Sequence, residues 1–276
     1  FCSVSRFSGR RYYTRPIDEV IDELEHLPRH RPILFTDDNF TLDRQRAIAL
    51  CRRMVERGVR RRYFVEGGLA MASDPELLAW LKRSGCTLVI VGIESVTRSA
   101  VAALGKPDLI RAGVNGYVGQ IARIHAHGLA VLGSFIVGLD GDTPETFDQL
   151  RDFILAAAVD CALINILHPD PGTPLWDRLN RERRLLYRGF PGDYVFYSPD
   201  NVCFRPSGMT PLELQEGTRR LVAALTRLPV IVRRAVGTWR RTRDWLSTGA
   251  AFAWNWRTRR SLRSFPLRDV RDIEAT

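Results

Sequence analysis

The most informative stretch of this sequence is LVIVGIES, residues 88–95. Its first six residues are an apolar run, and the run ends at the polar pair Glu94 and Ser95. A short continuous apolar run is typical of a strand that is buried on both faces, as in a parallel sheet covered by helices. This stretch therefore predicts a central parallel strand with polar groups at its carboxyl end.

Similar runs recur on both sides of it, about one every 30 residues, which is the length of a βα unit. We expect strands at residues 33–36, 62–66, 88–93, 130–137 and 162–167. Helical patterns separate them, at residues 17–27, 43–57, 74–83, 114–127 and 143–159, and another follows from residue 175. This alternation predicts an α/β fold, either a partial (β/α) barrel of parallel strands or an open doubly wound sheet.

The composition allows one large domain with an appendage, because the chain has 276 residues of which 45% are hydrophobic. We expect the barrel over residues 1–188 and a basic, mainly helical extension over residues 189–276. No run of 18 apolar residues predicts a membrane-spanning helix. Five cysteines, odd in number and without a C-x-x-C pair, argue against a disulfide framework and favour the reducing cytoplasm. Nucleotide-binding glycine motifs are absent from the sequence.

The positive charge is concentrated in the carboxyl-terminal quarter. Residues 1–204 carry 26 Arg and Lys against 25 Asp and Glu, whereas residues 205–276 carry 15 against 6. Four tryptophans accompany these arginines. The pattern suggests an anionic partner, and a peripheral membrane contact suits it better than nucleic acid. The alternative is that the tryptophans cover the open side of the barrel and the arginines are simply solvated.

Polar side chains follow each predicted strand. In a barrel of parallel strands the carboxyl ends converge on one mouth, where functional residues gather. Single acids after strands often cap the next helix. The three polar residues Asp37-Asp38-Asn39 are more than one cap needs, and a capping role explains Glu94 less completely as well. For His168 a hydrogen bond to the following Pro-rich turn is the simpler role. The strand-end residues are Asp37, Asp38, Glu66, Glu94, Ser95, Asp140 and His168.

The start of the sequence extends this interpretation. Phe1-Cys2, followed by basic residues and a helix, resembles the end of the C-x-x-x-C-x-aromatic-C motif of radical SAM enzymes. The runs FTDDNF (35–40), SGC (84–86) with VGIES (91–95), GSFIVGLDGDT (133–143) and PDPGTPL (169–175) resemble those of the subgroup with an N-terminal cobalamin-binding domain. The resemblance covers roughly residues 1–180, in order and at βα spacing.

The resemblance implies three cofactors: a [4Fe–4S] cluster, S-adenosylmethionine (SAM), and cobalamin in an upstream domain. Cys2 would be the third cluster ligand and a catalytic residue. Asp37 or Asp38 would bind the amino group of SAM, and Glu94 its ribose. The remaining residues expected at the cofactor are Phe1, Ser95, Val137, Gly138 and His168.

The resemblance further implies a C-methyltransferase that acts on an apolar, lipid-like or tetrapyrrole substrate and takes electrons from a donor. Two cluster cysteines are absent before Cys2, so we expect a fragment of a longer protein that is inactive alone. One alternative is a methylthiotransferase-like RNA-modifying enzyme, although residues 205–276 lack β-barrel alternation. Another is a non-catalytic binding module with a basic tail.

Overall fold

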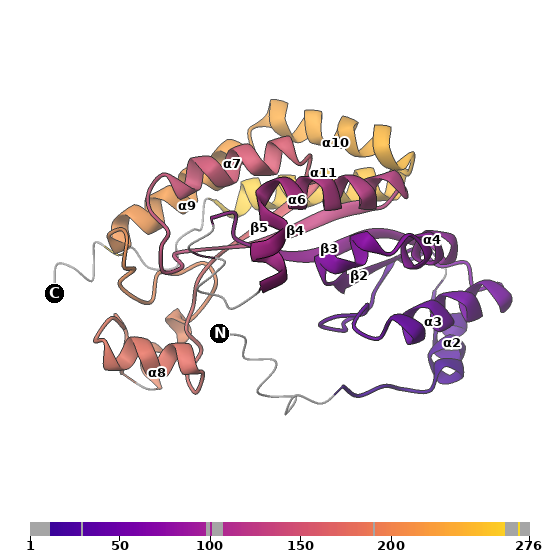
Figure 1. The fold of residues 1–276 in the computed structure, drawn as a ribbon, viewed down its shortest axis with the longest axis horizontal. Helices are drawn as coiled ribbons and strands as arrows, with labels where there is room; N and C mark the ends of the chain where they lie inside the picture. Colours follow the sequence, from indigo (N-terminus) through magenta and orange to yellow (C-terminus); the bar gives the residue numbers. More distant parts are fainter. Residues whose placement is uncertain are drawn as a thin grey trace.

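The computed structural model describes residues 12–28, 30–97, 100, 107–189, 191–262 and 270, with the backbone alone for residues 107–115 (Figure 1). The strands are β1 (Ile33–Leu34), β2 (Tyr63–Gly67), β3 (Cys86–Glu94), β4 (Ala130–Val137) and β5 (Cys161–Ile166). Helices of the barrel are α2 (Ile17–His26), α3 (Arg44–Glu56), α4 (Pro75–Ser84), α6 (Pro107–Ala126), α7 (Thr146–Ala156) and α8 (Pro174–Arg181). Helices α9 (Pro211–Leu225), α10 (Leu228–Thr242) and α11 (Trp245–Ser261) follow, and short 3-10 turns span Leu69–Ser73 (η1) and Gly192–Phe196 (η2).

The five strands form one parallel sheet in the order β1-β2-β3-β4-β5, which confirms the predicted half-barrel and its strand positions. Only β1 is shorter than expected. Its paired residues end at Leu34, beyond which Phe35 donates a backbone hydrogen bond to Phe64 and, after a turn, Phe40 donates one to Glu66. Asn39 stabilises that turn, since its side-chain oxygen accepts from the backbone and hydroxyl of Thr41.

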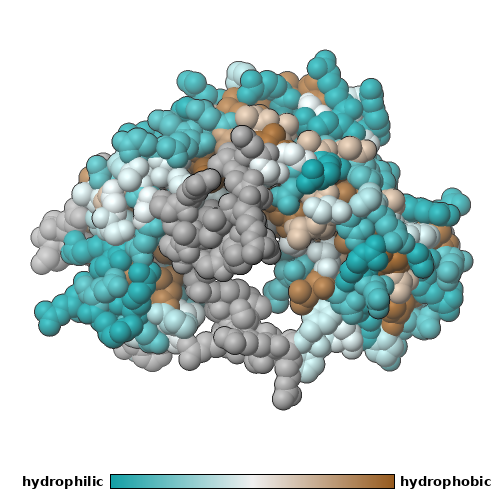
Figure 2. Space-filling view, viewed as in Figure 1, coloured by the Kyte–Doolittle hydropathy of each residue, from teal (hydrophilic) through white to brown (hydrophobic). Residues whose placement is uncertain are grey.

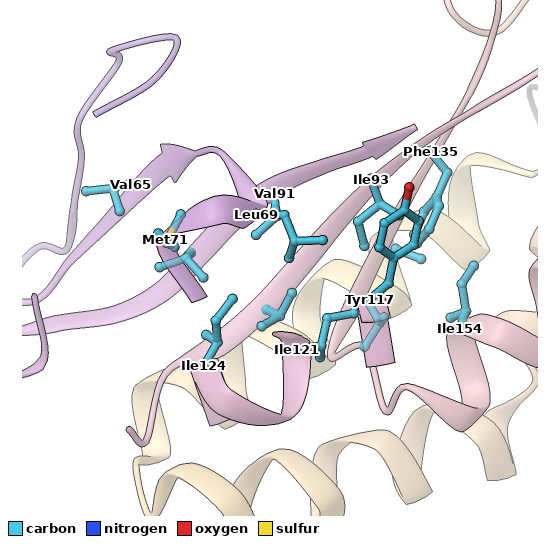
Figure 3. Packing of buried hydrophobic residues seen from close by; sticks show 14 of the residues in the cluster. Val65, Leu69, Met71, Val91, Ile93, Tyr117, Ile121, Ile124, Phe135 and Ile154 are labelled. Carbon is cyan, nitrogen blue, oxygen red and sulfur yellow. The ribbon is translucent and has the colours of Figure 1, made fainter. Parts of the chain in front are cut away.

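Helices α4, α6 and α7 cover the outer, convex face of the sheet (Figure 1). In Figure 3, Tyr117, Ile121 and Ile124 of α6 point toward the side chains of β3 and β4. All three are fully buried, as are Val91 and Ile93 of β3, the residues they approach. Burying one such aliphatic side chain contributes about 1.5–3 kcal/mol, so this layer is the main core of the barrel.

The concave face has a second, smaller core at the amino-terminal ends of the strands. Helix α11 crosses the sheet there, behind the strands in Figure 1. Ser247 Oγ donates to the carbonyl of Thr87, and Trp254 Nε1 donates to the carbonyl of Ala162 at 3.2 Å. The helix therefore forms a floor under the concave face. This core consists of Leu88, Ala130, Leu132, Cys161 and Ala251, with Phe64, Ile90, Leu163 and Trp254 against it.

Asp160 links α10 to the sheet and to α6. It is fully buried, and it accepts hydrogen bonds from Thr238 and Arg241 of α10 at 2.6 Å and from His125 of α6 at 2.9 Å. The backbone N–H of Val131 in β4 also donates to it. Burial alone would raise its pKa, but hydrogen bonds and charges from His125 and Arg241 hold the pKa down at about 2. Asp160 thus joins the basic extension to the barrel through an ionised carboxylate.

The predicted helical extension is confirmed in the part of the chain that the structure describes, where α9, α10 and α11 follow the barrel. Within that part, none of the helices has both the length and the hydropathy needed to span a lipid bilayer. The division at residue 188 stays a prediction, since Leu214 and Leu221 of α9 belong to the same core as the barrel strands.

Candidate functional site

The concave face changes character along the strands. Register places Phe64, Leu88 and Ala130 side by side near the floor. Toward the carboxyl ends the face carries Gly92, Ser134 and Asn165 beside the apolar Ile136, and all four residues are only partly buried. The floor is therefore apolar and filled, whereas the upper half of the face is accessible and carries polar groups at its rim.

Glu94 is held at this rim by an unusual backbone. It has a φ of 66°, and a register shift between Gly92 and Glu94 marks a bulge in β3. An added Cβ on Gly92 would lie 2.6 Å from Oε1 of Glu94. The carboxylate therefore lies back over the backbone of Gly92, in a place that any larger residue would occupy. Strain of this kind, about 1–3 kcal/mol, is often found at functional sites.

Glu94 lies within an acidic cluster that also contains Asp38 and Glu66. Partial burial raises the pKa of Glu66, and the negative charges of Asp38 and Glu94 raise it further. The three carboxylates come from the ends of β1, β2 and β3, so the fold brings them together from distant parts of the sequence. A cation placed among the three carboxylates would relieve the repulsion between their negative charges.

The other predicted site residues have neighbours of their own. Asp37 lines a pocket of about 330 Å³ together with Tyr12, Phe35 and Arg46. Ser95 is buried, and its hydroxyl lies 3.4 Å from that of Thr97. His168 Nδ1 lies 3.4 Å from the carbonyl of Ile166, and its Nε2 lies 3.7 Å from Asp170. His168 thus contacts its own turn, as the sequence suggested.

The end of β4 makes a tight turn at Val137 and Gly138. Gly138 has a φ of 88°, and an added Cβ would lie 2.8 Å from Leu214 of α9. The carboxylate of Asp142 accepts hydrogen bonds from the backbone N–H of Gly138 and of Leu139, each at 3.0 Å. Asp142 therefore fixes the backbone at the rim, while its other oxygen Oδ1 has no hydrogen-bond partner among the described residues.

Burial raises the pKa of Asp142 to about 6, above the ordinary value of 3.8. The folded state consequently binds a proton more tightly than the unfolded state, and stability falls as the pH rises from about 4 to about 6. Asp142→Asn is expected to remove this loss and to stabilise the protein at neutral pH by about 2–3 kcal/mol. Urea unfolding of both proteins across this pH range measures the effect. The exposed Asp200→Asn is the control, and an unchanged profile in Asp142→Asn would contradict the raised pKa.

The sequence interpretation missed two features of the rim. Gly92 was interpreted only as part of an apolar strand. A glycine two residues before a strand-end acid indicates that the acid's side chain can approach the glycine backbone closely. Asp140 was named among the strand-end groups, but its negative charge is balanced by two arginines. It accepts a hydrogen bond from Arg184 at 2.9 Å and also forms an ion pair with Arg178. It fastens α8 to the end of β4.

Phe1 and Cys2 lie outside the described residues. The four cysteines that the structure describes are buried free thiols, Cys51, Cys86, Cys161 and Cys203. Burial raises the pKa of each, so none of them presents a thiolate. Among the described residues, the structure has no group of three or more His, Cys, Asp or Glu side chains that could hold a metal ion. The role of Cys2 as a cluster ligand stays a prediction.

Similar sequences are known in methyltransferases. The chain is 31% identical over 194 residues to hopanoid C-2 methylase of Rhodopseudomonas palustris, covering 68% of this chain and 36% of that protein. It is 26% identical over 242 residues to bacteriochlorophyllide d C-12(1)-methyltransferase of Chlorobaculum tepidum, covering 86% and 51%. The chain therefore spans about a third to a half of the length of these relatives.

Solved structures share the fold. The radical SAM methyltransferase TsrM of Kitasatospora setae, solved with cobalamin and a [4Fe–4S] cluster, superposes with a TM-score of 0.55 at 22% identity, over 62% of this chain and 32% of that one. The cobalamin-dependent radical enzyme OxsB, solved with aqua-cobalamin and SAM, superposes with a TM-score of 0.56 at 10% identity, over 89% and 42%. Since the Radical SAM superfamily model also matches residues 1–154, more than half of the sequence, the chain belongs to the radical SAM superfamily.

Proposed function

We propose that this chain is the catalytic barrel of a cobalamin-dependent radical SAM C-methyltransferase whose substrate is apolar, lipid-like or a tetrapyrrole. The observation that carries the proposal is the acidic cluster at the mouth, with Glu94 folded over Gly92. Family membership gives such a cluster a cationic ligand to bind. The names of the two relatives, a hopanoid methylase and a bacteriochlorophyllide methyltransferase, support the substrate class.

SAM fits the described rim in charge. Its ammonium and sulfonium groups are cationic, and Asp38, Glu66 and Glu94 supply carboxylates on adjacent strands. Bound SAM supplies a carbon–sulfur bond that a one-electron donor can cleave. We assign Asp38 to the ammonium group and Glu94 to the ribose hydroxyls, where a carboxylate makes strong, charge-assisted hydrogen bonds. Glu66 would hold negative charge beside them.

The backbone at Val137 and Gly138 is assigned to the adenine ring. Asp142 fixes the backbone N–H groups of Gly138 and Leu139 in one orientation. Val137, which precedes this turn, is buried. An adenine could therefore lie against rigid backbone, with no ordering of the chain on binding.

The substrate class agrees with the lining of the concave face. Ile90, Ile136 and Leu163 are only partly buried. Ile90 and Leu163 pack, together with Trp254, against the small core of the concave face. Apolar walls with few polar groups are typical of sites for hydrophobic ligands. A methylthiotransferase function is less well supported, because residues 211–261 form the helices α9, α10 and α11. Cobalamin and a one-electron donor would come from outside this chain.

The test uses the full-length protein, reconstituted without oxygen. We expect a [4Fe–4S] spectrum, reductive cleavage of SAM, and methyl transfer to a hopanoid or tetrapyrrole acceptor. Gly92→Ala is expected to weaken SAM binding about 10- to 100-fold, because its Cβ displaces the Glu94 carboxylate and a charged hydrogen bond is worth about 1.5–3 kcal/mol. Equilibrium dialysis with labelled SAM measures the affinity.

The matched control is Gly119→Ala on α6, where the nearest neighbour of an added Cβ is 3.9 Å away. Both variants should unfold near the wild-type temperature, since Gly92→Ala meets only the flexible end of a side chain. If Gly92→Ala bound SAM as tightly as Gly119→Ala does, Glu94 would not be the ribose ligand. Absence of SAM cleavage by the reconstituted wild type would reject the proposed function itself.

A further inference from the structure

One side of α10 faces away from the fold and is apolar. Leu228, Val232 and Val236 follow one another at intervals of four residues, and they are 50%, 47% and 44% exposed. Near the end of the helix the rings of Trp239 and Trp245 stack with centroids 4.0 Å apart, and Trp245 is 72% exposed. Residues four apart lie on one helix face, so Leu228, Val232 and Val236 form a continuous stripe. The stacked Trp239 and Trp245 follow it, with Trp245 at the first position of α11.

A basic groove runs beside this stripe, between α10 and the end of α7. Its volume is about 680 Å³, and it is lined by Arg233, Arg240 and Arg241 together with apolar side chains such as Leu155 and Val236. The exposed Arg233 and Arg240 therefore border the apolar stripe. Figure 2 shows hydrophobic and hydrophilic side chains interspersed along the upper ridge of the molecule, where α10 lies.

The charge of this region has one sign. Between residues 217 and 262 the sequence has eleven arginines and a single acidic residue, Asp244. Asp244 does not offset the exposed arginines, because it is buried, caps α11 through Ser247 and forms an ion pair with Arg62. The outer surface of α10 is thus both apolar and positively charged.

We propose that this surface, defined by Leu228, Val232, Arg233, Val236, Arg240 and Trp245, docks on an anionic lipid bilayer. Exposed aliphatic side chains enter the boundary between head groups and acyl chains, tryptophan prefers that boundary, and arginine binds lipid phosphates. Nucleic acid would use the arginines but would leave the apolar stripe in water. The combination of both kinds of side chain on one helix matches an interfacial helix that lies in the membrane plane.

The test is flotation of the 276-residue chain with vesicles of phosphatidylcholine alone, and with vesicles in which phosphatidylglycerol replaces a third of it. We expect binding to the anionic vesicles that weakens with salt. Arg233→Gln combined with Arg240→Gln should weaken partitioning about 25-fold, since each basic residue near the surface contributes about a fivefold factor. Val232→Glu should reduce flotation to the level seen with neutral vesicles.

The matched control is Val195→Glu on η2, since Val195 is also exposed, at 67%, and lies outside α10. It should float like the wild type. Equal flotation of Val232→Glu and the wild type would overturn the proposal. Equal binding of the wild type to neutral and anionic vesicles would overturn it as well. Concentration-dependent dimerisation that Val232→Glu abolishes, without flotation, would show that a second copy covers the stripe instead. None of these outcomes depends on whether the protein binds or cleaves SAM, so they test membrane docking separately from the proposed function.

Discussion

Replacing Asp160 with alanine is expected to lower the free energy of unfolding by about 3–5 kcal/mol, the usual cost of removing one partner from a buried ion pair. Arg241 would lose its 2.6 Å contact, and the buried His125 would lose its carboxylate. The N–H of Val131 and the hydroxyl of Thr238 would lose an acceptor as well. Chemical denaturation followed by circular dichroism measures the loss.

The pH dependence gives a second readout for the same residue. The pKa of Asp160 in the folded protein is about 2, below the ordinary value of 3.8. Its contribution is therefore complete above about pH 4 and is lost as the pH falls toward 2. Asp160→Ala should lack this acid-dependent loss. Asp152→Ala, which removes an exposed carboxylate, should change stability by less than about 1 kcal/mol, and a similar small effect of Asp160→Ala would contradict its anchoring role.

Replacing Cys2 with alanine in the full-length protein is expected to abolish both the [4Fe–4S] spectrum and the cleavage of SAM. In the radical SAM motif, three thiolates bind three irons, so the loss of one leaves an iron without its ligand. Anaerobic reconstitution followed by iron analysis and absorbance spectroscopy measures the first effect. Chromatographic detection of the cleaved adenosyl product measures the second.

The control is Cys86→Ala, because Cys86 is fully buried in the core of the barrel and burial raises its pKa. This variant should lose stability by about 1 kcal/mol or somewhat more through the small cavity, and it should keep its iron. Normal cluster content in Cys2→Ala would falsify the assignment of Cys2. Loss of iron in Cys86→Ala with a folded barrel would mean that cluster content reports packing and not ligation.

Local sequence patterns were sufficient to predict the sheet. The strands that are buried on both faces, such as the LVIVGI run of β3, are continuous apolar stretches, and the helices between them have caps that can be read locally, such as Asp74 before Pro75. The strand-end rule also placed Asp38, Glu66 and Glu94 at one rim. The chain matches its family over residues 1–154, which agrees with the motif series found in the sequence.

Long-range contacts could not be predicted in this way. Asp160 follows a helix and precedes a strand, which suggests a cap, yet its partners lie 35, 78 and 81 residues away. The bulge at Glu94 was equally hidden, because a positive φ at a glutamate depends on the neighbouring strand and on the absent side chain of Gly92. In both cases the role of a residue is set by tertiary packing.

The floor that α11 forms has a kinetic consequence. Because this helix fills the concave face at the amino-terminal ends of β3, β4 and β5, ligands reach the face from the opposite rim. Product must then leave by the route along which the next substrate arrives. In an enzyme built on this barrel, accumulated product would compete directly with incoming substrate, and turnover at high conversion would be governed by the exchange of the two at a shared entrance.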